Sequence, residues 1–526
     1  MLVIACALLS LGIYLYGTLR FPLAAHLTPP PLDIGKLTSP AAGQYSPLAG
    51  EFFLLAISLL FGAWGLVCWL AGHIEQQTKT GWRRTPLLLG GPLFGFPAVA
   101  LLVMLFMYPI TAGDVFDYVS QIRVLTVYHA NPLTIAPSAF PGDAFLPFNA
   151  WPGMPASYGP LWALLSALVS QPAGNHFFAA VLAQKLLSIT ACLGCMAFVW
   201  LLAKQLCPER RWQAFVFFAW NPLVLFETGA NGHNDALMVL FLLAGLTALL
   251  AARWYWQSLA LPLLVASVLV KWTGVLLIPL AVIYLLRGGR ARRWGLAPLG
   301  LGAALTAAYA LPVIAPFWDT QHAWGVLLQA NLFTASPPAL LEGLLKPIYG
   351  SSVAGAAASL IGLGVFALVY LFLLARLAFP GARARLEPGA QITGAQRLIA
   401  VSHDSFFWYL ALATFWFQPW YLIALLPLAA LDPRPLARTR GALFSVGALL
   451  SYVVFIFIWI IYWQDEPRFT VQLAACLIIY SLPLFTRLLE GWQTRQRLYA
   501  LLASAQFPPT PPDAEEPRRR KSWWLL

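Results

Sequence analysis

Long apolar runs separated by short polar segments dominate this chain as far as about residue 490. A helix needs roughly 20 residues to cross about 30 Å of hydrocarbon. The hydrocarbon offers no water to the backbone, and a helix satisfies its own backbone polar groups. Eight runs have this length, and they cover residues 2 to 20, 51 to 71, 86 to 109, 177 to 204, 295 to 315, 352 to 377, 441 to 463 and 469 to 488. The pattern predicts an all-α, polytopic integral membrane protein.

Three further apolar stretches, 212 to 252, 258 to 286 and 398 to 432, are too long for one ordinary span and contain the breaks GANGHND, KW and QPW. Lys and Arg residues in short loops stay in the cytoplasm. If each stretch is a hairpin of two short helices, 25 of the 32 Lys and Arg residues lie inside. Single crossings of the last two would move eight arginines between Arg287 and Arg397 outside. We therefore predict about fourteen transmembrane helices with both termini in the cytoplasm.

Composition agrees with a membrane protein, because 60% of the residues are hydrophobic and only 10% are charged. Soluble domains carry about 25% charged residues, so a soluble enzyme is excluded. The net charge of +12 is spread over short loops, which indicates membrane orientation and not nucleic-acid binding. We expect one membrane domain over residues 1–500, with a large first external loop at 111–175, and a Pro-rich, basic cytoplasmic tail at 501–526.

Two carboxylates open the predicted external loop. Asp114 and Asp117 in GDVFDY follow the third apolar run directly, and a spacing of three places them on nearly one face of a helix. They could be a helix cap and a solvated surface charge. Alternatively, one is a general base, since a carboxylate in an apolar cavity has a raised pKa and can accept a proton.

A second polar cluster, in the segment NPLVLFETGANGHNDALMV, is dense for so apolar a chain. Asn, Gly and Asp are common in turns and at helix N-termini, so Asn234 or Asp235 could simply begin the next helix. That explanation covers the Asn and Gly residues but not His233, and a histidine can hydrogen-bond a phosphate or a sugar hydroxyl.

Lys271 interrupts the aliphatic run SVLVKWTGVLL. A cation there costs at least about 2.5 kcal/mol unless it is paired or solvated. It could extend to the interface, or it could neutralise a phosphate on the external side. Later in the chain, FWFQPWYL places Gln418, Trp420 and Tyr421 at another break. These residues suit sugar binding but also form ordinary interfacial belts; Gln321, His322 and Trp324 are weaker candidates.

The order of these motifs resembles that of the GT-C membrane glycosyltransferases, in particular the polyprenyl-phosphate-mannose-dependent α-1,6-mannosyltransferases. The resemblance extends from Gly113 to Ala430 and is carried by GDVFDY, ANPL, YGPLW, NPLVLFETGANGHNDALM, VKW and QPWYL. Many relatives have NPY where this chain has NPL at Asn131 to Leu133.

The resemblance implies an inverting enzyme of the plasma membrane that moves a sugar, mannose, from a polyprenyl-phosphate carrier to a glycan or glycolipid hydroxyl on the extracytoplasmic face. Asp114 corresponds to the family's catalytic acidic residue, and we expect Lys271 and His233 to bind the donor phosphate. We expect substrate contacts from Asp117, Tyr118, Asn131, Tyr158, Glu227, Asn234, Asp235, Gln418, Trp420 and Tyr421. The implied reaction requires neither a nucleotide nor a metal, which agrees with the absence of a P-loop or Rossmann fingerprint and with carboxylates that show no dedicated metal-ligand spacing.

A transporter or flippase of a lipid-linked sugar, with Asp114 as a proton-coupled gate, is the main alternative. Transporters usually show inverted repeats and charges at the midplane, whereas the acids here gather at outer helix ends. A ligase that moves a whole glycan is a nearer alternative.

Overall fold

A computed structural model describes residues 1–38, 47–78, 85–287, 296–318, 332–379, 393–463 and 467–506. Within these ranges the chain is all-α, with two isolated β-bridges and no strand. Seven helical spans are long and apolar enough to cross a bilayer by length and composition. They lie in α1 (Leu2–Arg20), α4 (Pro47–Thr78), α8 (Phe177–Leu206), α15 (Ala297–Ile314), α17 (Ser351–Ala378), α20 (Pro435–Tyr452) with its extension, and α22 (Arg468–Gln506).

The remaining predicted run forms α5 (Thr85–Met104), which contains two prolines. All eight predicted runs are therefore confirmed as helical. The extension of α20 is a π-helical segment, η12 (Val453–Ile458), followed by α21 (Trp459–Tyr462). Short helices occupy the connections: α2 (Leu23–His26), α3 (Ile34–Leu37), η4 (Pro208–Arg210), α12 (Trp254–Gln257), η8 (Ala315–Phe317) and α16 (Pro337–Tyr349).

The three long stretches are broken where the sequence predicts. The first divides into α9 (Arg211–Ala219), α10 (Pro222–Leu225), the π-helical η5 (Phe226–Ala230) and α11 (Asp235–Leu249). The second divides into α13 (Ala260–Val270), η6 (Trp272–Leu276) and α14 (Leu277–Leu286), and the third into α18 (Gly394–Leu412), η11 (Pro419–Tyr421) and α19 (Leu422–Leu431). Each break brings polar groups to the end of an apolar helix, where they must line a cavity or find partners.

The predicted external loop is folded, with two helices, α6 (Asp114–Thr126) and α7 (Pro160–Ser170), and the short turns η1 (Pro137–Ala139), η2 (Leu146–Phe148) and η3 (Gln171–Ala173). Arg123 holds it together, because its Nε atom lies 2.7 Å from Asp143 Oδ2. The Tyr128 hydroxyl donates to the same oxygen at 3.0 Å, and the Arg123 guanidinium lies 4.2 Å from the Phe145 ring centroid. The loop is therefore a built structure that can position residues.

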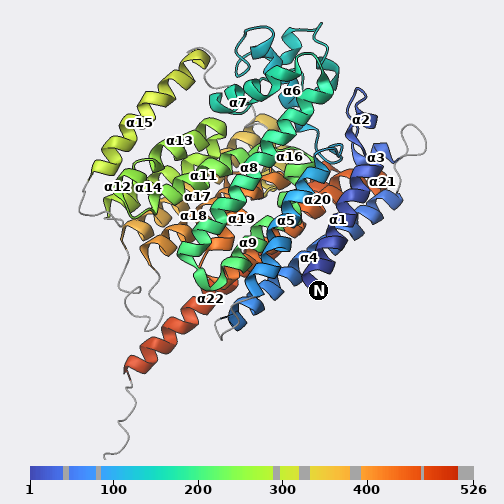
Figure 1. Ribbon diagram of the computed structural model, residues 1–526. Helices are drawn as coiled ribbons and strands as arrows, with labels where there is room; N and C mark the ends of the chain where they lie inside the picture. The colour runs from blue at the N-terminus through green and yellow to red at the C-terminus, as the bar shows by residue number, and fades with distance from the viewer. Residues whose placement is uncertain are drawn as a thin grey trace, which may run out of the picture.

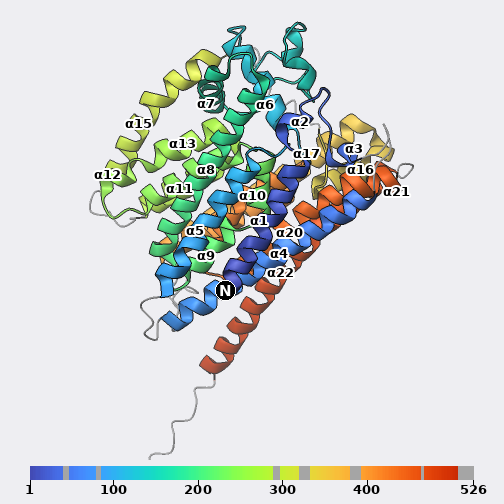
Figure 2. The same ribbon diagram turned by 45° about the vertical axis from the view of Figure 1, so that its right-hand side comes forward.

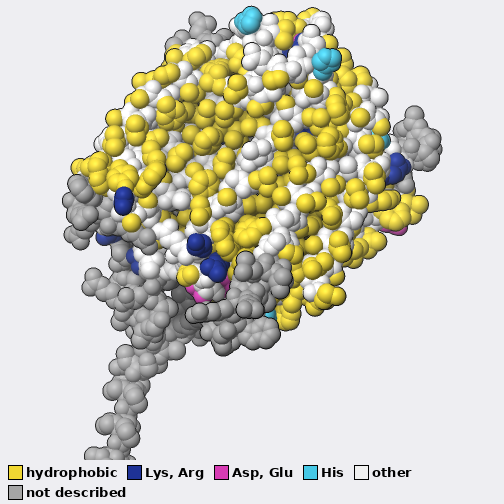
Figure 3. Space-filling view, in the orientation of Figure 1, with side chains coloured by type: hydrophobic (Ala, Val, Ile, Leu, Met, Phe, Trp, Pro, Cys, Tyr) yellow, Lys and Arg dark blue, Asp and Glu magenta, His cyan; other side chains and the backbone are white. Residues whose placement is uncertain are grey.

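Helices α6 and α7 lie at one end of the bundle, and the chain's N-terminus and the last turns of α22 lie towards the other (Figures 1 and 2). Between these ends, α11 packs against α8 and α13, and α20 packs against α22. Hydrophobic side chains cover most of the face seen in Figure 3, and most of its visible Lys and Arg side chains lie near the lower edge. This distribution is typical of a helical bundle that lies within a bilayer.

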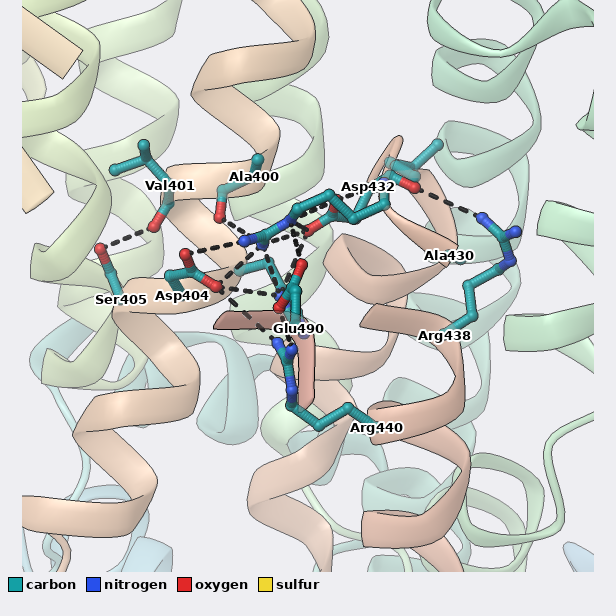
Figure 4. A network of polar contacts seen from close by, with 12 residues as sticks. Ala400, Val401, Asp404, Ser405, Ala430, Asp432, Arg438, Arg440 and Glu490 are labelled. Atoms are coloured by element: carbon teal, nitrogen blue, oxygen red, sulfur yellow. Dashed lines mark hydrogen bonds and ion pairs between the residues drawn. The ribbon is translucent and has the colours of Figure 1, made fainter. Parts of the chain in front are cut away.

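A buried ion network, which the sequence pattern did not reveal, ties α18, α20 and α22 together (Figure 4). The Arg434 Nη2 atom lies 2.6 Å from Asp432 Oδ2 and 2.8 Å from Asp404 Oδ1. Glu490 on α22 pairs with Arg440 on α20 and also with Arg487, at 2.9 Å. Asp404, Asp432 and Arg440 are at most 1% exposed, so each charge depends on its partners for stabilisation.

Two sequence predictions fall wholly or partly on residues outside the described ranges. Gln321, His322 and Trp324 lie in the segment 319–331. In the predicted tail, residues 501–506 continue α22 as helix, and residues 507–526 are not described.

Candidate active site

A cavity of about 620 Å³ lies beneath the folded loop. Its wall combines α6, the segment before α7, the N-terminus of α11, the break after α13, and the chain between α18 and α19. Nine of the residues that the sequence singles out line it: Asp114, Asp117, Tyr118, Tyr158, Asp235, Lys271, Gln418, Trp420 and Tyr421. Residues separated by three hundred positions thus meet in one pocket.

The two carboxylates of α6 have different surroundings. Asp114 is the first residue of the helix and Gly113 is its N-cap, so Asp114 is not the cap that the simplest interpretation proposed. Burial raises the pKa of Asp114 above its ordinary value. Asp117 accepts a hydrogen bond from the Ala150 backbone N–H at 2.7 Å. Burial, together with the charge of Asp114, raises the pKa of Asp117 to about 8.

Lys271 stands in the break between α13 and η6, where its backbone is extended (φ −150°, ψ 122°). Its Nζ atom donates to Asp235 Oδ1 at 2.7 Å and lies 4.4 Å from the ring centroid of Tyr421. The residue is only 8% exposed. The lysine therefore does not extend to the surface; it points into the cavity from a fixed position.

The motif YGPLW is fixed by a close backbone approach. Gly159 donates its N–H to Val270 O at 3.0 Å, and a Cβ on Gly159 would lie 2.1 Å from the Leu269 carbonyl oxygen. Only glycine fits there without movement of the backbone. Tyr158 precedes Gly159, and Lys271 follows Val270. This backbone contact therefore places Tyr158 next to Lys271, whose Nζ atom lies 5.6 Å from the Tyr158 ring centroid.

Four predicted site residues do not line the cavity. Asn131 donates to the Phe317 carbonyl at 3.0 Å and braces the loop. Asn234 is the N-cap of α11, without a side-chain cap bond.

Glu227 and His233 are fully buried, and the His233 ring stacks on Trp420 with centroids 3.7 Å apart. His233 therefore reaches the cavity only through its neighbours, and a direct phosphate contact from it has no support in this arrangement.

Several cavity residues were not predicted. Gln121, Trp151, Met154, Trp272, Thr273 and Trp416 belong to the wall, together with the apolar Leu363 of α17 and Phe406 and Leu410 of α18. A sequence signal existed for the tryptophans, since Trp151 lies in the Pro-rich loop and Trp272 and Trp416 adjoin motifs already noted. The aliphatic residues carried no signal, because any apolar helix contains such side chains.

No group of three or more His, Cys, Asp and Glu side chains able to hold a metal ion occurs among the residues that the structure describes. The polar chemistry of the cavity rests on three carboxylates, one ammonium group, and the hydroxyl, amide and aromatic groups around them.

The helical bundle and its one-sided polar cavity define a polytopic membrane protein with a candidate ligand site at one end. Residues 36–287 match the family described as α-(1→6)-mannopyranosyltransferase, N-terminal domain. This match bears out the resemblance to the GT-C-like mannosyltransferases and includes Asp114, His233 and Lys271. The matched family is one of glycosyltransferases by its description, and the matched residues make up a little under half of this chain.

Curated relatives agree with this match. A probable α-(1→6)-mannopyranosyltransferase of Mycolicibacterium smegmatis is 26% identical over 391 residues, which are 65% of each chain. The α-(1→6)-mannopyranosyltransferase A of Mycobacterium tuberculosis is 27% identical, over 67% of each chain. The α-(1→6)-mannopyranosyltransferase B of Corynebacterium glutamicum is 25% identical, over 42% of this chain and 38% of the relative. The chain thus spans about two thirds of the length of the first two.

Proposed function

We propose that this protein is an inverting mannosyltransferase that moves mannose from a polyprenyl-phosphate carrier to a hydroxyl of a glycan or glycolipid on the extracytoplasmic face. The names of its relatives support mannosyl transfer and an α-(1→6) linkage. The observation that carries the proposal is the convergence of Asp114 and Lys271 on one cavity. A base and a cation facing the same space are what the reaction requires.

In the proposed reaction, the acceptor oxygen attacks C1 of the sugar and the bond from C1 to the phosphate oxygen breaks. Asp114 takes the proton of the attacking hydroxyl, and polyprenyl phosphate leaves as an anion. Lys271 stabilises the negative charge that develops on the leaving oxygen. The acceptor approaches from the side opposite the phosphate, which accounts for inversion. The step balances without any further reactant.

The charges of the cavity can accommodate a phosphate. Three carboxylates line it, but the pKa of about 8 lets Asp117 keep a proton near neutral pH. Asp235 is paired with Lys271, and an ammonium group has three donors, so the lysine can bind a phosphate oxygen while it keeps this partner. Asp114 is then the carboxylate that remains to act as a base.

Two kinds of wall suit the two parts of the donor. Trp420 and Tyr421 offer flat faces to a sugar, whereas Leu363, Phe406 and Leu410 offer an apolar surface to the first prenyl units. The external orientation is supported by the positive charges, 25 of which the predicted topology assigns to cytoplasmic segments.

The test is an assay of purified protein in lipid vesicles with polyprenyl-phosphoryl mannose and an oligomannoside acceptor. We expect a mannosylated product whose new bond has the anomeric configuration opposite to that of the donor. Asp114→Asn should abolish turnover while the variant stays folded and still binds donor. Asp33→Asn, a change of the same kind in α3's N-cap, is the matched control. Movement of the donor across the membrane without product would instead support a transporter.

A further inference from the structure

We propose that Glu227 and His233 are positioning residues that fix the direction of the hydrogen bond between Tyr118 and Tyr158, so that this wall of the cavity accepts hydrogen bonds from a sugar hydroxyl. The inference deepens the proposed function and rests on it. Both residues are 0% exposed, so they act on the ligand only through the side chains that touch it.

The backbone around this pair is unusual and tightly held. Glu227 lies in the π-helical turn η5, a feature that often marks functional sites. Gly232 has a φ of +74°, and a Cβ there would lie 2.9 Å from the Lys185 side chain. Lys185 in turn donates to the carbonyl oxygens of Met104, at 2.9 Å, and Met107. This tightly packed turn therefore fixes the position of the His233 imidazole.

His233 makes three contacts, each in a different direction. Its Nε2 atom lies 3.3 Å from Glu227 Oε2, and its Nδ1 atom lies 3.4 Å from the Tyr118 hydroxyl oxygen. Its ring lies flat against Trp420, with 17° between the planes. Tyr118 and Trp420 both line the cavity. The Nε2–Oε2 pair lies at ion-pair distance without hydrogen-bond geometry, so the histidine lies between a buried carboxylate and two groups that can touch a substrate.

Proton positions follow from this order of contacts. A carboxylate beside Nε2 favours a proton on that nitrogen, which leaves a lone pair on Nδ1. The Tyr118 hydroxyl must then donate its proton to Nδ1. The Tyr118 oxygen, 3.1 Å from the Tyr158 oxygen, accepts the proton of Tyr158 in turn. Both tyrosines have then used their only donors within the protein.

This arrangement of protons makes the cavity wall a hydrogen-bond acceptor. Tyr118 and Tyr158 offer only lone pairs to a ligand, and they do so beside Asp114, which also accepts. A wall of acceptors selects a ligand that donates, such as the hydroxyl groups of a sugar, and disfavours groups that only accept. The opposite proton arrangement would present a donor and weaken this selection.

The cost of burying the pair supports a specific role. Removing a carboxylate and an imidazole from water is unfavourable unless they are well paired. Glu227 Oε2 accepts from Asn231 Nδ2 at 2.8 Å, and Asn231 Nδ2 lies within 2.9 Å of Thr111 Oγ1. Apolar side chains of similar volume would fill the same space without that cost. A tuned hydrogen-bond direction is something that only polar groups can provide.

Glu227→Gln tests the direction with almost no change in shape, because an amide can donate to Nε2 and move the proton to Nδ1. We expect kcat/KM to fall about tenfold, mainly through the donor KM, the size of one misdirected hydrogen bond. In a Tyr118→Phe background, Glu227→Gln should lower kcat/KM only slightly, since the hydrogen bond from Tyr118 to His233 is already absent. Equal losses in both backgrounds would overturn the proposal, and Glu209→Gln, an exposed site, is the control.

A second measurement does not depend on turnover. Solid-state 15N spectra of histidine-labelled protein in bilayers distinguish the two neutral tautomers, and the His233 signal is assigned by its loss in His233→Gln. We expect the proton on Nε2 in the wild-type protein and on Nδ1 in Glu227→Gln. A wild-type proton on Nδ1 would overturn the inference even if the protein transfers mannose. Absence of mannosyl transfer with the expected tautomer would count against the proposed function only.

Discussion

Lys271 and Asp235 are joined by a 2.7 Å contact between Nζ and Oδ1, although 36 residues separate them along the chain. Lys271 belongs to the break that ends α13, and Asp235 is the first residue of α11. A carboxylate at a helix N-terminus is stabilised by the helix dipole. It can therefore hold the ammonium group at the cavity wall in the absence of ligand and leave the other N–H donors for an anion.

From this pair we expect Lys271→Met to impair use of the lipid donor more than use of the acceptor. The variant keeps the apolar stem but loses the charge that would stabilise the phosphate. The donor KM should rise at least tenfold, or kcat should fall by a similar factor, with the acceptor KM nearly unchanged. Steady-state kinetics with each substrate varied in turn measure this, and equal effects on both substrates would contradict the phosphate role.

The same variant should shift the pH profile of the enzyme. Asp114 must be ionised to act as a base, so kcat/KM should fall as the pH drops through its pKa. Burial raises that pKa, while the charge of Lys271 lowers it. Removal of the Lys271 charge should therefore move the acidic limb to higher pH. An acidic limb that stays in place in Lys271→Met would show that the limb belongs to another group.

Asp117 should make the folded protein less stable at high pH. Its pKa of about 8 in the folded state lies above the value of about 3.9 for an unfolded chain. The folded protein then binds the extra proton between these values, so stability decreases as the pH rises from 4 to 8. Thermal unfolding of Asp117→Asn should lack this part of the pH dependence. Parallel curves for both proteins would exclude a raised pKa.

The approach of Gly159 to Leu269 predicts a sensitive position. Gly159→Ala would place a Cβ 2.1 Å from a carbonyl oxygen, and the backbone must shift at a cost of about 1–3 kcal/mol. We expect a lower melting temperature and a loss of activity, because Tyr158 and Lys271 would move apart. Gly153→Ala is the matched control, since a Cβ at Gly153 meets nothing within 4 Å. Equal melting temperatures for the two variants would contradict the close packing.

The predicted topology can be tested by labelling intact cells with a membrane-impermeant maleimide. A cysteine at Ala139, which is exposed in the folded loop, should react from outside. A cysteine at Glu209, exposed between α8 and α9, should react only after the membrane is opened. Cys68 is the only native cysteine that is not buried in the described residues, so Cys68→Ala provides the background. The reverse labelling pattern would place the cavity in the cytoplasm.

The sequence indicated which segments form long apolar helices and where each long apolar stretch breaks. Long apolar runs favour helices that span a bilayer, and the local signals GANGHND, KW and QPW marked the three breaks. A charged residue alone does not interrupt a helix, since Lys185 lies within α8. Lys271, Gln418 and Trp420 could therefore be named as site residues, and their place on one cavity agrees with that expectation.

Only the tertiary structure decided which side chains face one another. Depth along the membrane normal says nothing about rotation of a helix or about its lateral neighbours, and those depend on packing between distant segments. For this reason the sequence did not indicate that Asp235 pairs with Lys271, that His233 lies behind Trp420, or that Arg434 joins two buried aspartates. Each of these contacts forms only when separate helices meet.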